Sequence, residues 1–223
     1  MKSFLRIMLG VVLAIACTHA LMQWQQGRAA APRPLDPAFL RLSPQEVATL
    51  PVATRFDMPL GSEHGALTYN ARAFRMAGHL GDDLNGIGGG NSDLGDPVYA
   101  AGTGRVVYAG LPHESWGKMI ILAHRLPEGD AAGPVVQTVY AHLQDIQVRT
   151  GQTVPRGEAI GTVGTAKSAP LAHLHFEVRS GPYVNPGQGY ADIPLNRISP
   201  QMFIRTHRGA GASILNPAPS PEP

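Results

Sequence analysis

Hydrophobic and polar residues alternate in short runs through the middle of the chain, and glycine or proline separates these runs. The clearest runs cover 97–101, 105–109, 118–123, 135–143 and 172–179. Alternation with a period of two is typical of half-buried strands, and short strands at regular intervals favour an antiparallel sandwich or barrel. No sustained helical period interrupts them. We therefore expect an all-β fold, with an antiparallel β-sheet domain over residues 61–196.

The segments on either side of this domain lack such a pattern. Residues 21–60 are rich in proline and alanine and are expected to form a linker. Within them, Ser43-Pro44-Gln45-Glu46 has the N-cap serine, first-turn proline and third-position glutamate of a capping box, which predicts a short helix that ends before Pro51. Residues 197–223 are expected to form a C-terminal tail, and its proline-rich end to be disordered because it cannot bury a core.

The N-terminus has the order of charged, apolar and small residues that is typical of a secretory signal. Lys2 and Arg6 precede an apolar run over 7–17, and small residues follow it, so residues 1–20 are predicted to be a signal peptide. This predicts export to the periplasm or cell envelope. The run is shorter than the roughly 20 residues that cross a bilayer, so an uncleaved membrane anchor is the alternative, as is lipidation of Cys17. A chain without residues 1–20 has no cysteine and therefore no disulfide.

Composition and charge exclude several classes of protein. Charged residues make up 15% of the 223 residues, and 26 glycines and 20 prolines suit short strands and turns rather than a coiled coil. The 18 basic residues against 16 acidic ones give a net charge of +2 without a basic stripe, so no nucleic-acid partner is expected. The glycine-rich segment 85–91 lacks the Lys-Ser/Thr pair and the following helix of a phosphate-binding loop.

One predicted strand places four polar side chains on a single face. His173, His175, Glu177 and Arg179 alternate with apolar residues over 172–179, so their side chains point to the same side of the sheet. Two imidazoles that lie two residues apart on one face suit a metal site. A solvated polar face would give the same pattern, and the two readings are equally compatible with this strand.

Two further segments carry residues of the same chemistry. His79 and Asp83 precede the glycine-rich segment, and imidazole together with carboxylate suits zinc. In the run over 135–143, Tyr140 and His142 are expected to share the polar face of a strand. Elsewhere, His124 closes an apolar run and is expected to be structural.

Taken together, three motifs resemble the lysostaphin/LytM-type zinc metallopeptidases, which cut peptidoglycan peptides. The motifs are His79-x-x-x-Asp83, Tyr140-Ala141-His142-Leu143 and His173-Leu174-His175-Phe176-Glu177, in that order, and the resemblance covers residues 78–179. It implies a domain of duplicated-hybrid-motif type and peptidoglycan peptides as substrate. It also implies a zinc ion held by His79, Asp83 and His175, with His142 and His173 as the catalytic pair.

The resemblance leaves some properties open. A non-catalytic domain of this type, which binds peptidoglycan or activates another cell-wall hydrolase, is the alternative function. Glu177 is interpreted either as a residue that orients His175 or as a surface carboxylate. The long segments 85–96 and 125–134 are expected to border the substrate groove. The motifs do not distinguish a direct cross-link between stem peptides from a glycine bridge as the bond that is cut, and they do not predict an oligomeric state.

Overall fold

The computed structural model of the protein describes residues 40–61 and 67–209. The predicted signal peptide over 1–20 and the proline-rich end of the chain lie outside the described residues. Within the described part, no helix is both long enough and apolar enough to span a membrane.

Most strands of the described residues form one large antiparallel sheet. Its ten strands are β2 (Thr68–Arg72), β3 (Asp82–Gly86), β4 (Pro97–Tyr99), β5 (Gly104–His113), β6 (Gly117–Arg125), β7 (Val135–Ile146), β8 (Thr153–Val154), β9 (Ala159–Ala166), β10 (Ala169–Ser180) and β12 (Arg197–Ile198). The main order is β2-β3-β10-β9-β7-β6-β5-β8, with β4 beside β9 and β12 beside β10. All five predicted runs form strands, so the predicted all-β antiparallel fold is confirmed.

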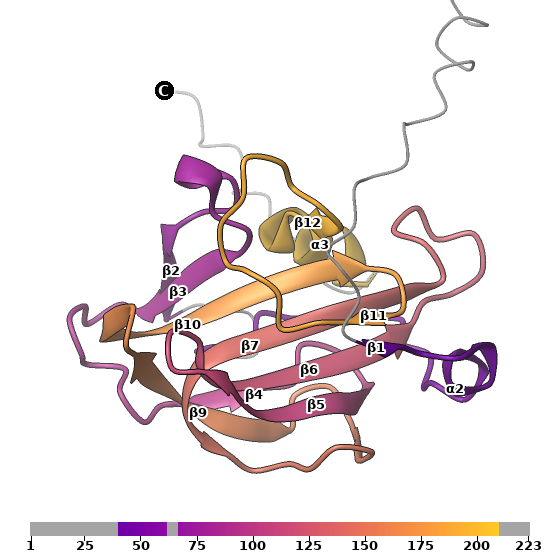
Figure 1. Ribbon diagram of the computed structural model, residues 1–223, viewed down its shortest axis with the longest axis horizontal. Helices are drawn as coiled ribbons and strands as arrows, with labels where there is room; N and C mark the ends of the chain where they lie inside the picture. Colours follow the sequence, from indigo (N-terminus) through magenta and orange to yellow (C-terminus); the bar gives the residue numbers. More distant parts are fainter. Residues whose placement is uncertain (1–39, 62–66, 210–223) are drawn as a thin grey trace, which may run out of the picture. The chain divides into compact units, whose positions relative to one another are not determined.

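Strand β10 is central to this arrangement because it pairs with β3, β7, β9 and β12 along different parts of its length. Figure 1 shows β10, β7, β6 and β5 lying side by side. The pairing brings residues that are distant in the sequence onto neighbouring strands.

Both faces of the sheet bury apolar side chains. A first cluster includes Leu84, Leu122, Tyr140 and Phe176. A second cluster includes Ile121, Val139, Ala141 and, from outside the large sheet, Leu42 and Leu50. Because each face has its own cover, β6 and β7 are buried along most of their length.

The described part of the expected linker, residues 40–60, belongs to the packed domain. Strand β1 (Leu40–Arg41) pairs with β11 (Tyr183–Val184), and helix α2 (Pro44–Ala48) follows. The capping box predicted for α2 is confirmed, since the Ser43 side chain accepts from the Glu46 backbone N–H and the Glu46 carboxylate accepts from the Ser43 N–H. The apolar residues that enter the core, such as Phe56 and Leu60, are isolated and irregularly spaced, so no periodicity revealed them.

The first residues of the expected tail are also ordered. Strand β12 pairs with β10, and helix α3 (Pro200–His207) begins at the N-cap residue Ser199. Phe203 and Ile204 of α3 lie in the first cluster, where the Phe203 ring centroid lies 4.8 Å from that of Phe56. A helix of eight residues with three buried positions is too short to give a strong helical period.

Candidate metal centre and groove

Three of the predicted site residues converge at one point in the structure. His79 directly follows the 3-10 turn η1 (Met76–Gly78), Asp83 lies on β3, and His175 lies opposite Asp83 on β10. Asp83 Oδ1 is 3.0 Å from His175 Nδ1 and 3.2 Å from His79 Nε2, and the two nitrogens are 3.0 Å apart. All three residues are buried.

This geometry fits a zinc ion. Zinc binds nitrogen and oxygen ligands at about 2.0–2.1 Å, which places the donor atoms of a tetrahedral site about 3.3 Å apart, close to the three distances above. Among the described residues, His79, Asp83 and His175 are the group of histidine, cysteine and acidic side chains whose donor atoms all lie within 4.8 Å. Burial alone would raise the pKa of Asp83, but hydrogen bonds with His175 and His79 hold it below its ordinary value.

The Glu177 carboxylate contacts His175 at Nε2, the ring nitrogen that does not face Asp83. Its Oε1 lies 3.0 Å from His175 Nε2, while its Oε2 accepts hydrogen bonds from Arg179 Nε at 2.6 Å and Arg197 Nε at 3.0 Å. Burial would raise the pKa of Glu177, but the two guanidinium groups hold it well below its ordinary value. The ionised carboxylate therefore accepts from His175 Nε2–H and leaves Nδ1 to face the other two donors.

The interpretations of Glu177 as a surface carboxylate and of its strand as a solvated polar face are wrong. Glu177 is fully buried, and His175 and Arg179 are nearly so. The segment after β11 covers this face, since Arg179 Nη2 donates to the Pro186 carbonyl at 3.0 Å and Arg197 Nη2 to the Gln188 carbonyl at 3.4 Å.

His142 and His173 are oriented in the same way. His142 Nδ1 lies 3.0 Å from the Trp116 carbonyl oxygen, and His173 Nδ1 lies 2.9 Å from that of Leu171. A carbonyl only accepts, so each Nδ1 carries the hydrogen and each neutral ring leaves Nε2 as its acceptor. The rings lie 4.9 Å apart, and His173 Nε2 lies 3.6 Å from Asp83 Oδ1.

The His142 side chain is buried. Burial, together with the nearby His175 and His173, lowers the pKa of His142 to about 3. The imidazole is therefore neutral near pH 7.

The prediction that Tyr140 shares a polar face with His142 is wrong. Tyr140 is fully buried in the first cluster, and its hydroxyl accepts a hydrogen bond from the Ala101 N–H at 2.8 Å. His142 has a φ of 62°, which lies in the left-handed region and breaks the alternation of β7. The side chain of His142 therefore reaches the face on which His175 lies.

The five predicted site residues line one groove of about 790 Å³, namely His79, Asp83, His142, His173 and His175. Its walls include aromatic residues from three segments, namely Tyr69 on β2, Trp116 before β6 and Tyr190 after β11. Trp116 is held in place by a hydrogen bond from its Nε1 to the Gly187 carbonyl at 3.0 Å. No pattern in the sequence marks these three residues, because each stands alone in a turn or an edge strand and belongs to no motif.

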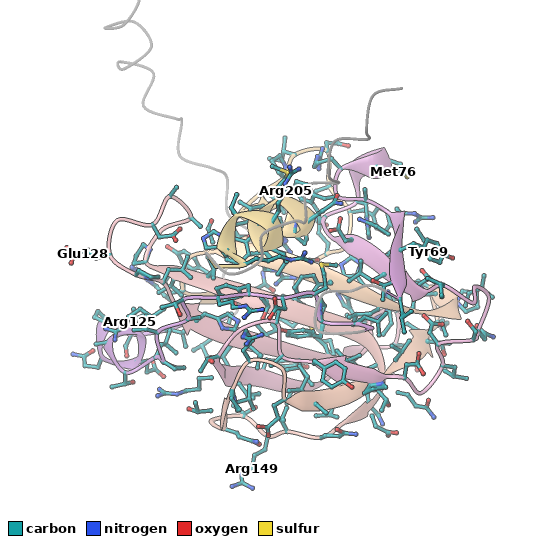
Figure 2. All side chains as sticks on the ribbon, turned by 180° about the vertical axis from the view of Figure 1, so that it is seen from behind. Tyr69, Met76, Arg125, Glu128, Arg149 and Arg205 are labelled. Carbon is teal, nitrogen blue, oxygen red and sulfur yellow. The ribbon has the colours of Figure 1, made fainter. Side chains whose placement is uncertain are left out.

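Only one of the two long segments that we expected to border the groove contributes described residues to its lining. Residues 85–96 contribute Asn85 and Gly90 to its lining. Residues 125–134 do not line it, and Figure 2 shows Glu128 at the end of the sheet away from Tyr69. There Asp130 lies 3.0 Å from His207 Nε2 of α3, so the expectation for this segment is wrong.

His124 is structural, as predicted. It is buried, and burial lowers its pKa to about 4. Its Nδ1 donates to the Thr103 carbonyl at 2.8 Å, so its Nε2 accepts from the Thr138 hydroxyl at 2.8 Å. The Tyr140 hydroxyl then donates to Thr138 Oγ1 at 2.9 Å. This chain of hydrogen bonds needs a neutral imidazole.

Several known proteins are similar to this chain. The lipoprotein NlpD of Yersinia enterocolitica is 34% identical over 93 residues, which cover 41% of this chain and 87% of that protein. The peptidoglycan DD-endopeptidase ShyB of Vibrio cholerae is 33% identical over 104 residues, 47% of this chain and 21% of the relative. The uncharacterized lipoprotein YgeR of Escherichia coli is 36% identical over 85 residues, 38% of this chain and 30% of the relative. In these last two cases the chain spans less than a third of the relative's length.

A solved structure and a family profile also match this chain. The catalytic domain of lysostaphin from Staphylococcus simulans aligns with a TM-score of 0.43 and 24% identity over 73% of this chain and 98% of that one. The profile of peptidase family M23 matches residues 85–186, which include His142, His173 and His175 and begin just after His79 and Asp83. With this profile and a relative matched over most of its length, the chain belongs to peptidase family M23.

Proposed function

We propose that the protein is a zinc-dependent endopeptidase that hydrolyses peptide bonds in the stem peptides or cross-links of peptidoglycan. One observation carries this proposal: beyond the three converging donors, His142 and His173 both present a free Nε2 to the same groove. His79, Asp83 and His175 would hold the zinc ion. Zinc supplies a Lewis acid and a water molecule of lowered pKa when it is bound by three protein ligands.

The protein's own residues provide the proton transfers. Because the backbone carbonyls of Trp116 and Leu171 fix the Nδ1–H groups of His142 and His173, each ring accepts a proton at Nε2. A ring protonated there donates the proton to the leaving amine, as general acid–base catalysis requires. A ring that has taken up a proton at Nε2 also donates a hydrogen bond to the negative charge that develops on the scissile carbonyl oxygen.

The relatives support both the substrate class and an envelope location. ShyA and ShyB of Vibrio cholerae are named peptidoglycan DD-endopeptidases, and two other relatives are named as lipoproteins. Together with the predicted signal peptide over 1–20, these names support a location in the periplasm or cell envelope, where peptidoglycan is the substrate.

A second candidate is a non-catalytic domain that activates another cell-wall hydrolase. It is favoured by the similarity to NlpD of Salmonella typhimurium, a murein hydrolase activator that is 28% identical over 145 residues. An activator does not need catalytic groups, whereas this chain retains three convergent donors and two oriented histidines. The enzyme is therefore the function that the site supports better.

The test is the release of peptide fragments from purified peptidoglycan. The zinc-loaded protein is expected to release fragments, a chelator to abolish the release, and added zinc to restore it. His142→Ala and His173→Ala are each expected to lower the rate by roughly 10²- to 10⁴-fold while zinc content stays the same. His207→Gln, on α3 outside the groove, is the matched control. Wild-type activity in both alanine variants would refute the proposal, and stimulation of a second hydrolase without release would support the activator.

A further inference from the structure

Arg72 gives the groove a fixed positive charge. Among the lining residues that the structure describes, Arg72 is the only arginine or lysine, and Asp83 is the only aspartate or glutamate. The Arg72 side chain is 49% exposed, so its guanidinium group is accessible to a ligand. A bound peptide would therefore contact one cation at this wall, and no described lining residue other than Asp83 offers the guanidinium group a carboxylate.

The guanidinium group is held in place before any ligand binds. Arg72 Nη1 donates a hydrogen bond to the Tyr190 hydroxyl, and the Arg72 Cζ lies 5.9 Å from the centroid of the Tyr190 ring. Its Nε lies 4.0 Å from Asp83 Oδ2. Among the described residues, Nη2 has no hydrogen-bond partner. An arginine oriented in this way loses less conformational entropy when a ligand binds.

We propose that Arg72 binds a carboxylate of the substrate close to the scissile bond, an inference that rests on the proposed function. The planar guanidinium group matches a carboxylate with two parallel hydrogen bonds. Arg72 adjoins the candidate zinc ligand Asp83, and an extended peptide advances about 3.4 Å per residue. The carboxylate therefore belongs to a residue within about one or two positions of the scissile bond.

This assignment selects a substrate class. Direct cross-links between stem peptides carry free carboxylates near the linking amide, whereas a glycine bridge is neutral along its length. Arg72 thus favours the direct cross-link, a choice that the motifs left open.

A matched pair of synthetic cross-linked stem peptides tests the assignment. The two peptides differ only in the carboxyl group nearest the scissile amide, which is free in one and a carboxamide in the other, and an oligoglycine of equal length is the third substrate. Charge-assisted hydrogen bonds of this kind correspond to a preference of roughly 10- to 100-fold in kcat/KM for the free carboxylate. Arg72→Gln is expected to bring the ratio of the two rates close to one.

Two further variants separate recognition from a structural role. Arg72→Lys keeps the charge without the planar fork and is expected to retain only part of the preference. Arg149→Gln removes an exposed arginine far from Tyr69 of the groove (Figure 2) and is expected to keep all of it. Equal rates on the two peptides in the wild type would overturn the proposal. So would an Arg72→Gln variant that loses activity on both peptides in the same proportion.

Failure of the proposed function is distinguishable from failure of this inference. If the zinc-loaded protein cuts none of the three substrates, the enzyme proposal is wrong. Calorimetric titration with the same two peptides then tests Arg72 by binding alone. Tighter binding of the free carboxylate, lost in Arg72→Gln, supports the inference, and equal affinities overturn it.

Discussion

Gly81 packs closely against residues 175–177 of β10, and its replacement by alanine tests how the candidate metal site is supported. A Cβ atom at this position would lie 2.6 Å from the Phe176 carbonyl oxygen, 2.8 Å from His175 Nε2 and 2.9 Å from Glu177 Cγ. The first of these atoms belongs to the backbone of a central strand and cannot rotate away. The Gly81→Ala protein must therefore separate the backbone at Gly81 from β10.

The size of the movement follows from the same distances. Ordinary van der Waals contact begins near 3.4 Å, so relief of the 2.6 Å contact requires a displacement of 3.4 − 2.6 = 0.8 Å. Because Gly81 lies between His79 and Asp83, a displacement of that size away from β10 would lengthen the 3.0 Å distances from His175 Nδ1 to His79 Nε2 and to Asp83 Oδ1. Such a misplacement of the donor atoms is expected to lower zinc affinity by at least the roughly 10-fold that loss of an outer contact of a metal ligand costs. The overpacking itself lowers the free energy of unfolding by about 1–3 kcal/mol.

Competition with a chromophoric chelator measures zinc affinity, and urea unfolding of the metal-free protein measures stability. Gly110→Ala is the matched control, because a Cβ there meets only the end of the Tyr108 side chain at 3.3 Å. If Gly81→Ala bound zinc as tightly as the wild type, the spacing of His79 and Asp83 from His175 would not control the affinity of the site, and this reasoning would be refuted.

Three other predictions concern buried groups. Glu177→Gln leaves two buried arginines without their shared carboxylate and is expected to lower the free energy of unfolding by about 3–5 kcal/mol, whereas Glu158→Gln, at an exposed position, is expected to have no effect in the same urea titration. His124 is protonated in the unfolded chain below pH 6.5 but in the folded protein only below about pH 4. His124 is therefore expected to lower the stability by about 3 kcal/mol as pH drops from 6.5 to 4, and a free energy of unfolding that depends on pH in the same way in His124→Gln and in the wild type would contradict this. Phe203→Ala is expected to cost about 3–5 kcal/mol and the exposed Met202→Ala almost nothing; equal thermal shifts would show that α3 adds little to the core.

Local pattern was sufficient for much of the fold. The alternation in 97–101, 105–109, 118–123, 135–143 and 172–179 predicted five strands, because side chains of a strand point to opposite faces in turn. The capping box at Ser43 predicted α2 because its hydrogen bonds join residues only three positions apart, so they too depend on local sequence. The residue types and order of the histidine and aspartate motifs also indicated the candidate site.

The sequence by itself determined which residues share a strand and which side chains are chemically suited to hold a metal ion. Only the tertiary structure decided what covers each face, because covering segments come from distant parts of the chain. Burial of Glu177 depends on Arg197, twenty residues further on, and the place of His142 depends on a left-handed backbone that no alternation predicts. Periodicity describes one strand at a time, whereas the convergence of His79, Asp83 and His175 depends on the pairing of β3 with β10.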